Sequence, residues 1–272
     1  MAFSFCVEFG DYGVVRKVGS CVSGYLIGRY ANREVRMKSK SASLFHFTPK
    51  MEYLISIFKN GFYPRFCLED SSLMDWYKHD YIAIPMVCFC DIPLSKISEH
   101  TGFYGSYGIG LKRDWGNECG LSPVIYASSK SQIVDLARSL TFRMLSSEVE
   151  NQQIEEDASN LLSLLKPISG TMHKDNETVL RDFYQENEWR FVPRTRHAIP
   201  HDKYDKIRDH ANQEMEKHKL EFKLNDIQYI FVKTESEILE LAKLIRQEYH
   251  NEQDWILLIS KIVSLDTLMP DI

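Results

Sequence analysis

The 272-residue sequence predicts an α+β fold, in which helices interrupt the strands and the sheet is completed late in the chain. Residues 82–90 form a continuous apolar run rich in β-branched and aromatic side chains, which is typical of a buried strand. Residues 235–249 repeat apolar side chains at the spacing of an amphipathic helix. With 44% hydrophobic and 26% charged residues, the chain can bury a sizeable core.

The charge and cysteine content bound the class of protein. A formal net charge of −5 argues against a broad nucleic-acid-binding surface but leaves room for a local basic groove. No apolar run reaches the roughly 18–20 residues that span a bilayer, so we expect no membrane partner. The six cysteines lack the spacing of a disulfide framework. We therefore expect a cytoplasmic protein in a reducing compartment.

The chain divides near Met37. Residues 1–36 show no helical period and no signal-peptide pattern, so they predict a poorly ordered extension. An equally good interpretation is a mis-called start, with Met37 as the true first residue. Residues 37–272 predict a single domain with a helical insertion around residues 129–166.

The first strong motif is a strand that carries one histidine and runs into a helix. Residues 44–48 (LFHFT) predict the strand, and Gly61 supplies the left-handed position that ends the helix. Thr48 suits the N-cap and Pro49 the first helical position. The helix then has one apolar stripe, formed by Met51, Leu54, Ile55 and Phe58.

His46 in this strand has two interpretations. A buried histidine that bonds a neighbouring carbonyl is the commoner case. The functional alternative is a neutral imidazole that bonds a ribose hydroxyl of a nucleotide, with Thr48 adding a second polar contact. A helix start beside the ring would favour an anionic ligand.

The remaining elements follow from apolar periodicity and turn residues. Strands are predicted over residues 82–90, 107–111, 123–127, 188–193, 227–232 and 255–259. Helices are predicted over residues 94–100, 131–145, 153–165, 204–220 and 235–249, with a loop at 166–176.

The strand that begins at Glu188 carries its charges on one face. By period-2 alternation Glu186, Glu188 and Arg190 share that face, opposite Trp189 and Phe191. The arrangement predicts either a solvated, salt-bridged edge strand or a carboxylate that stabilises a developing cation.

Three further motifs have weaker signals. Tyr104 and Tyr107 flank glycines, which offers aromatic faces beside bare backbone for a nicotinamide or a base, although an ordinary turn is as common. Arg65 is either a phosphate ligand or a surface arginine. Cys88 and Cys90 lack a second ligand pair at metal spacing, so we expect core cysteines and no metal site.

Taken together, these segments resemble the abortive-infection AbiGi family of bacterial phage-resistance proteins. The resemblance covers roughly residues 40 to 260. The matching segments are residues 44–48, 60–70, 84–95, 107–111 and 188–190. That family bears the label antitoxin, which implies a cognate toxin or antitoxin encoded nearby.

The arrangement is also similar to the ADP-ribosyltransferase superfamily, including the DNA-modifying DarT-like toxins. This resemblance implies a split mixed or antiparallel sheet with flanking helices that binds NAD as a substrate. It places His46 at the ribose, Tyr104 or Tyr107 at the nicotinamide, and Glu188 as the catalytic carboxylate. The sequence departs from the family at Cys88-Phe89-Cys90-Asp91, where many members have Ser-Thr-Ser.

The same resemblance implies that Arg65 matches an arginine after the first helix of the DarT-like group, and that Thr48 and Arg190 belong to the NAD site. The expected function is a phage-defence ADP-ribosyltransferase that modifies nucleic acid or protein. The alternative is a binding module of the same fold, without catalysis, that neutralises a partner toxin.

Overall fold

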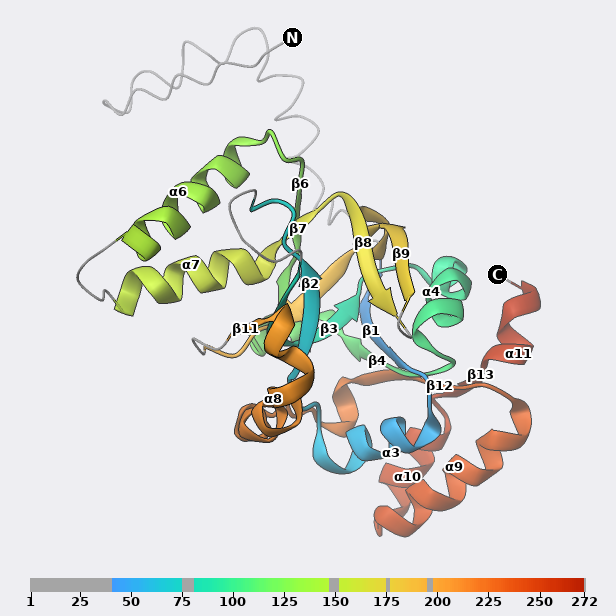
Figure 1. The fold of residues 1–272 in the computed structure, drawn as a ribbon. Coiled ribbons are helices and arrows are strands. Elements are labelled where there is room, and N and C mark those ends of the chain that lie inside the picture. The colour runs from blue at the N-terminus through green and yellow to red at the C-terminus, as the bar shows by residue number, and fades with distance from the viewer. Residues whose placement is uncertain (1–40, 75–80, 147–151, 175–176, 195–197, 272) are drawn as a thin grey trace, which may run out of the picture. The chain divides into compact units, whose positions relative to one another are not determined.

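The computed structural model describes residues 41–74, 81–146, 152–174, 177–194 and 198–271 (Figure 1). It confirms the predicted α+β class, with a mixed sheet and helices on both of its faces. The extension predicted over residues 1–36 and the alternative start at Met37 lie outside the described residues.

Within the described residues the main sheet has nine strands. Its path is β13 (Ile262–Ser264), β12 (Ile227–Val232), β4 (Tyr107–Lys112), β1 (Ser43–Thr48), β3 (Tyr81–Cys90), β10 (Glu188–Phe191) and β5 (Ser122–Pro123). Two more strands, β2 (Arg65–Asp70) and β11 (Ile199–Pro200), pair with the first half of β3. The sheet is mixed because β12 and β13 pair in parallel, whereas the other pairs are antiparallel.

The sheet opens beside β3. Strand β2 pairs with residues 81–86 of β3, and β1 meets its other end, where Phe45 pairs with Cys90. From His46 onward β1 follows β4, with Thr48 opposite Tyr107. The central strands therefore diverge, and polar side chains can enter the sheet between them.

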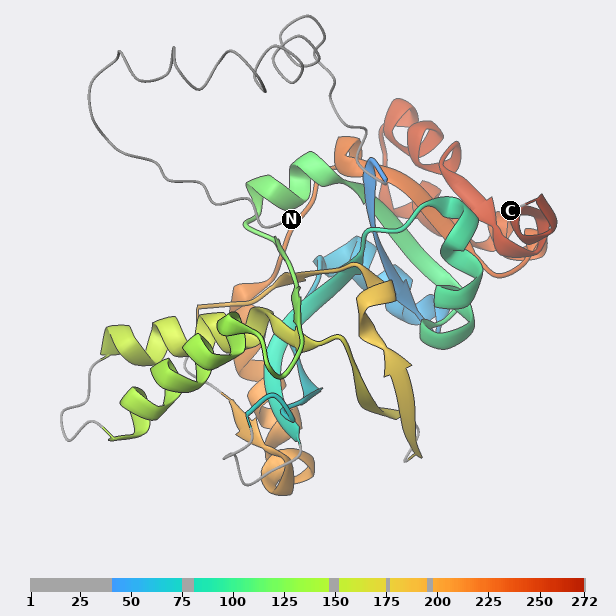
Figure 2. The ribbon, with the colours of Figure 1, turned by 90° about the horizontal axis from the view of Figure 1, so that it is seen from above.

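Both faces of β1 are buried, which explains its nearly continuous apolar sequence. Leu44 faces α3 (Met51–Asn60), α9 (Glu235–Glu248) and α10 (Glu252–Ile259) in the larger core cluster. Phe45 points the other way, toward Ile97 of α4 (Ile97–Tyr104) and Leu265 of α11 (Leu265–Leu268). Figures 1 and 2 show these helices around the strands.

The predicted start of α3 was wrong by two residues. Thr48 is the last residue of β1, and Lys50 is the N-cap. The Thr48 hydroxyl still orders the turn, because it accepts from the Lys50 amide at 3.3 Å and donates to the Lys50 carbonyl at 3.1 Å. The predicted end at Gly61 is confirmed, and its amide donates to Ile57 O at 2.9 Å; its φ of 78° is positive as expected, but its ψ of −167° lies outside the left-handed helical region.

Two segments differ in type from the prediction. The loop expected over residues 166–176 contains β7 (Leu165–Pro167) and β8 (Ser169–Lys174), which pair with β6 (Ile125–Ala127) and β9 (Glu177–Asp182). The strand expected over residues 255–259 belongs to α10, which begins where the Asn251 side chain accepts from the Gln253 amide at 3.0 Å. Short apolar runs do not distinguish strand from helix, and short polar strands have no apolar period.

The other helices lie at the borders of the sheet. Helices α6 (Gln132–Ser146) and α7 (Gln152–Leu164) lie side by side, as both views show, and the predicted insertion around residues 129–166 stays a prediction. Helix α8 (His201–Met215) packs on β2 and β3 through Met215 against Phe66. In the described parts of the chain, none of the helices combines the length and apolar content that crossing a bilayer requires.

Candidate functional site

A cavity of about 890 Å³ lies where β1, β2 and β3 diverge. Its lining comes from both sides of the sheet, with Ile57 on the α3 side and Phe47 and Tyr104 on the α4 side. The polar residues that line it include His46, Thr48, Arg65, Glu69, His100, Tyr104, Lys166, Glu186, Glu188, His201, Asp205 and Arg208. The structure thus brings five of the seven predicted site residues to one cavity: His46, Thr48, Arg65, Tyr104 and Glu188.

His46 is fixed at the opening between β1 and β3. Its Nδ1 lies 2.8 Å from the Cys88 carbonyl oxygen, and its ring packs edge-on against Phe62. A carbonyl oxygen only accepts, so Nδ1 carries the proton and Nε2 keeps its lone pair. Burial lowers the pKa of His46 despite this hydrogen bond, which keeps the ring neutral. The interpretation of His46 as a histidine that bonds a neighbouring carbonyl is confirmed, and the residue also lines the cavity, while its contact with a ribose hydroxyl stays a prediction.

Glu188 belongs to a buried group of ions that we call the charge cluster: Glu69, Lys166, Glu186, Glu188 and Arg190. Arg190 binds Glu188 with two nitrogens, Nε to Oε1 at 2.8 Å and Nη2 to Oε2 at 3.0 Å. Arg190 is 1% exposed and Glu188 is 7% exposed. The alternative prediction, a solvated and salt-bridged edge strand, is therefore wrong for this pair. Period-2 alternation places both side chains on one face of β10, as predicted.

Lys166 is the second cation of the charge cluster. Its Nζ lies 3.0 Å from Glu188 Oε2, 3.1 Å from Glu186 Oε2 and 3.8 Å from Glu69 Oε2. These carboxylates come from three segments: β2, the turn before β10, and β10 itself. The spacing of these residues in the sequence does not predict that Lys166 contacts the three carboxylates. Lys166 is the first residue of the segment that was predicted to be a loop.

The surroundings keep Glu188 ionised. Burial raises the pKa of the Glu188 carboxyl, but the nearby charges of Arg190 and Lys166 outweigh burial and hold its pKa well below the ordinary range. A hydrogen bond from the Cys88 thiol lowers it further. Burial and then the Glu188 carboxylate raise the pKa of Cys88 well above its usual value, so Cys88 remains a thiol.

Tyr104 reaches the charge cluster from the end of α4. Its hydroxyl donates to Glu186 Oε1 at 2.7 Å, and burial together with that carboxylate raises the pKa of Tyr104 far above its usual value. The His100 ring packs against it at 5.2 Å. Glu186 lies in the 3₁₀ turn before β10, rather than in the strand as the alternation predicted.

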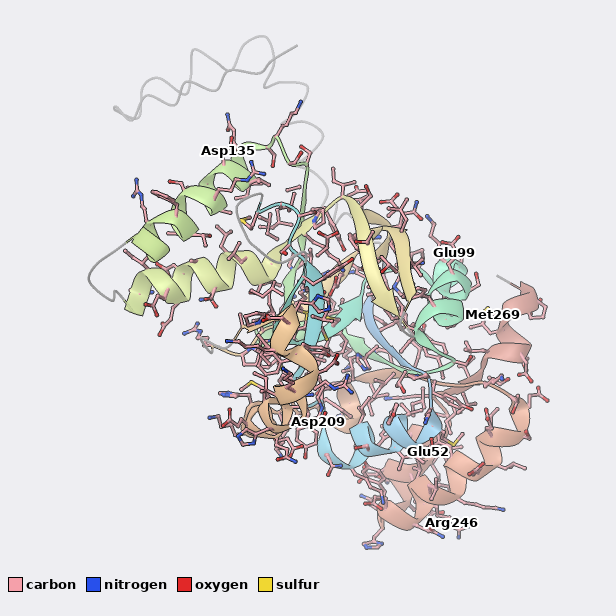
Figure 3. All side chains as sticks on the ribbon, in the orientation of Figure 1. Glu52, Glu99, Asp135, Asp209, Arg246 and Met269 are labelled. Carbon is pink, nitrogen blue, oxygen red and sulfur yellow. The ribbon has the colours of Figure 1, made fainter. Side chains whose placement is uncertain are left out.

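Two arginines line the cavity from exposed positions. Arg65 lies 3.6 Å from Glu216 Oε1, in the 3₁₀ turn that follows α8, and lies over the Tyr63 ring at 5.6 Å. Arg208, which the sequence analysis missed, lies over the Tyr204 ring at 5.6 Å. Figure 3 labels its neighbour Asp209 on α8, which lies 3.5 Å from the Arg208 Nε.

Two predicted residues lie elsewhere. The Tyr107 hydroxyl donates to Glu237 Oε1 of α9 at 2.7 Å, so among the predicted aromatics Tyr104 is the one beside the cavity. Arg190 lies behind Glu188 rather than in the cavity wall, and its Nη1 donates to the Ser163 carbonyl at 2.8 Å. Thr48 lines the cavity, but its hydroxyl is already bonded to Lys50.

Comparison with known proteins identifies relatives in phage defence. The profile of the family described as abortive phage resistance protein AbiGi, antitoxin, matches residues 60–233. An abortive phage resistance protein AbiGi from Lactococcus lactis subsp. cremoris is 31% identical over 246 residues, which cover 77% of this chain and 94% of that protein. No solved structure matches the chain. The chain belongs to the AbiGi family of abortive phage resistance proteins.

Proposed function

We propose that the protein is an NAD-dependent ADP-ribosyltransferase-like effector of phage defence. One observation carries the proposal: Glu188, ionised and held by two cations, lines the same cavity as His46, whose Nε2 keeps its lone pair. A fixed carboxylate stabilises an oxocarbenium-like centre, and a neutral imidazole accepts a hydrogen bond from a ribose hydroxyl.

The lining suits NAD as a substrate. Arg65 and Arg208 are cations that could bind its pyrophosphate, while Tyr104 and Phe47 offer aromatic surface. Arg190 would act through Glu188, and Thr48 would shape the wall through its turn with Lys50. The opened sheet is consistent with the split sheet of an ADP-ribosyltransferase-like core.

The reaction transfers ADP-ribose. The bond between ribose C1′ and the nicotinamide nitrogen breaks, and its electron pair leaves with nicotinamide. A nucleophile on nucleic acid or protein bonds to C1′ and loses its proton. Glu188 would stabilise the positive charge that develops on the ribose between these events.

Nicotinamide release from labelled NAD tests the proposal, with and without nucleic acid or phage lysate. We expect turnover by the wild type and a loss of at least about 100-fold in Glu188→Gln. Glu99→Gln is a matched control, because Glu99 is an exposed residue of α4, labelled in Figure 3. Absence of turnover in every setting, or full turnover by Glu188→Gln, would contradict the proposal.

A second candidate is a non-catalytic antitoxin that binds a toxin encoded nearby. The word antitoxin in the family description favours it, as does the charge cluster, in which Arg190 and Lys166 already neutralise Glu188. Co-expression with the adjacent gene distinguishes the two candidates. If Glu188→Gln still relieves the toxicity of a partner through a stable complex, the result supports a non-catalytic antitoxin.

A further inference from the structure

Glu69 is a second carboxylate at the base of the cavity, and it comes from a different strand than Glu188. Arg190 joins the two, because its Nη2 lies 2.6 Å from Glu69 Oε2 and 3.0 Å from Glu188 Oε2. Both carboxylates line the cavity. A single guanidinium nitrogen therefore holds them side by side.

The carboxylates of the charge cluster differ in how their oxygens are occupied. Both oxygens of Glu188 accept from Arg190, and Lys166 adds a bond to Oε2. Glu186 accepts from Tyr104 on Oε1 and from Lys166 on Oε2. Glu69 uses Oε2 alone, and among the described residues no hydrogen bond or ion pair ends on its Oε1. Its side chain is 12% exposed, so Oε1 is the carboxylate oxygen in the cluster that remains available to a ligand.

We propose that Glu69 is the general base of this site and removes the proton of the acceptor. The inference rests on the proposed function, and it divides the chemistry between two residues. Glu188 is ionised and fully bonded, which suits charge stabilisation. Glu69 lines the cavity and keeps one oxygen, Oε1, to which no described residue donates a hydrogen bond, which suits proton transfer.

The step commits the site to one class of acceptor, a hydroxyl group or water. Its oxygen bonds to ribose C1′ while the nicotinamide departs with the electrons of the old bond. The acceptor proton passes to Glu69 Oε1 and afterwards to solvent. An acceptor that is already an anion, such as azide, needs no such transfer.

Azide rescue of Glu69→Ala tests the proposal, with NAD as the substrate and water as the acceptor. We expect nicotinamide release to fall by about 10²–10⁴-fold in this variant. Azide should restore the release, and the product should be ADP-ribosyl azide, detected by mass spectrometry. Glu186→Ala and Glu188→Ala are matched controls from the same cluster, and azide should restore neither.

The outcomes separate this proposal from the one on which it rests. No nicotinamide release by the wild type, with water, azide or phage lysate, would overturn both proposals. Wild-type release together with a Glu69→Ala variant that keeps full activity, or that azide does not rescue, would overturn the role of Glu69 alone. Thermal unfolding checks that the variants fold, and Glu69→Gln, which keeps an acceptor for Arg190, replaces Glu69→Ala if the latter does not.

Discussion

A single residue, Lys166, connects the carboxylates of the charge cluster. Its ammonium lies within 3.1 Å of two of them, and the residue is 3% exposed. In Lys166→Met the buried carboxylates lose this partner, so we expect the free energy of unfolding to fall by about 3–5 kcal/mol, measured by urea denaturation at pH 7. Lys59→Met is the control, because Lys59 pairs with Glu248 at 3.3 Å on the surface and should contribute at most about 1 kcal/mol. Equal losses would show that the cluster is not a special source of stability.

His100 makes stability depend on pH. Burial, and then the charge of Arg181, lower its pKa to about 4 in the folded protein, whereas an unfolded histidine titrates near ~6.5. The unfolded chain thus binds the extra proton between these values. The contribution is fully present above pH ~6.5 and is lost as pH falls toward 4, by roughly 3 kcal/mol in total.

His100→Phe keeps a ring against Tyr104 but removes this titration. We expect its free energy of unfolding to fall less steeply than that of the wild type as the pH is lowered from 7 to 4.5. Chemical denaturation at several pH values measures both slopes. Parallel slopes would contradict the assignment.

At the scale of elements, the end of α4 positions Tyr104. Gly105 has φ 123°, and a Cβ there would overlap the backbone of Thr48 and Pro49. Gly105→Ala should therefore destabilise the fold by at least about 1–3 kcal/mol and displace α4 from β1. Gly102→Ala in the same helix meets no atom within 4 Å and should be neutral or stabilising by up to about 1 kcal/mol. Thermal unfolding measures the stability of both variants, and equal melting temperatures for the two would contradict the role of Gly105.

The elements that sequence patterns identified are those with a strong apolar period. Strand β3, helix α9 and the C-terminus of α3 follow directly from their residues. Strands β7 and β8 were missed, because their stability comes from pairing with β6 and β9 rather than from a periodic sequence of their own. The same holds for Lys166, which acquires its role through contacts with residues about 20 and 97 positions away.

At the scale of the whole molecule, ligand binding should be visible as stability. If NAD occupies the cavity, a concentration of about 100 times its Kd should stabilise the protein by about 2.7 kcal/mol. The melting temperature should rise by several degrees in thermal-shift measurements. His46→Ala should lose most of this rise, while Tyr107→Phe should keep it, since Tyr107 bonds Glu237 outside the cavity. A rise that both variants keep would place NAD elsewhere.

The order of the amino acids was enough to predict the α+β class, the family, and the strand positions of His46 and Glu188, since these depend on local periodicity and on motifs that stay together along the chain. The three-dimensional arrangement was needed to see that Tyr104 rather than Tyr107 borders the cavity, that Arg190 lies behind Glu188, and that Glu69 and Lys166 contact this pair. These arrangements depend on how β2, β3 and β10 diverge and pair. A buried charge is stable only when it is paired, and its partner can lie far away in the sequence. The spacing of residues along the chain therefore does not predict which charges pair.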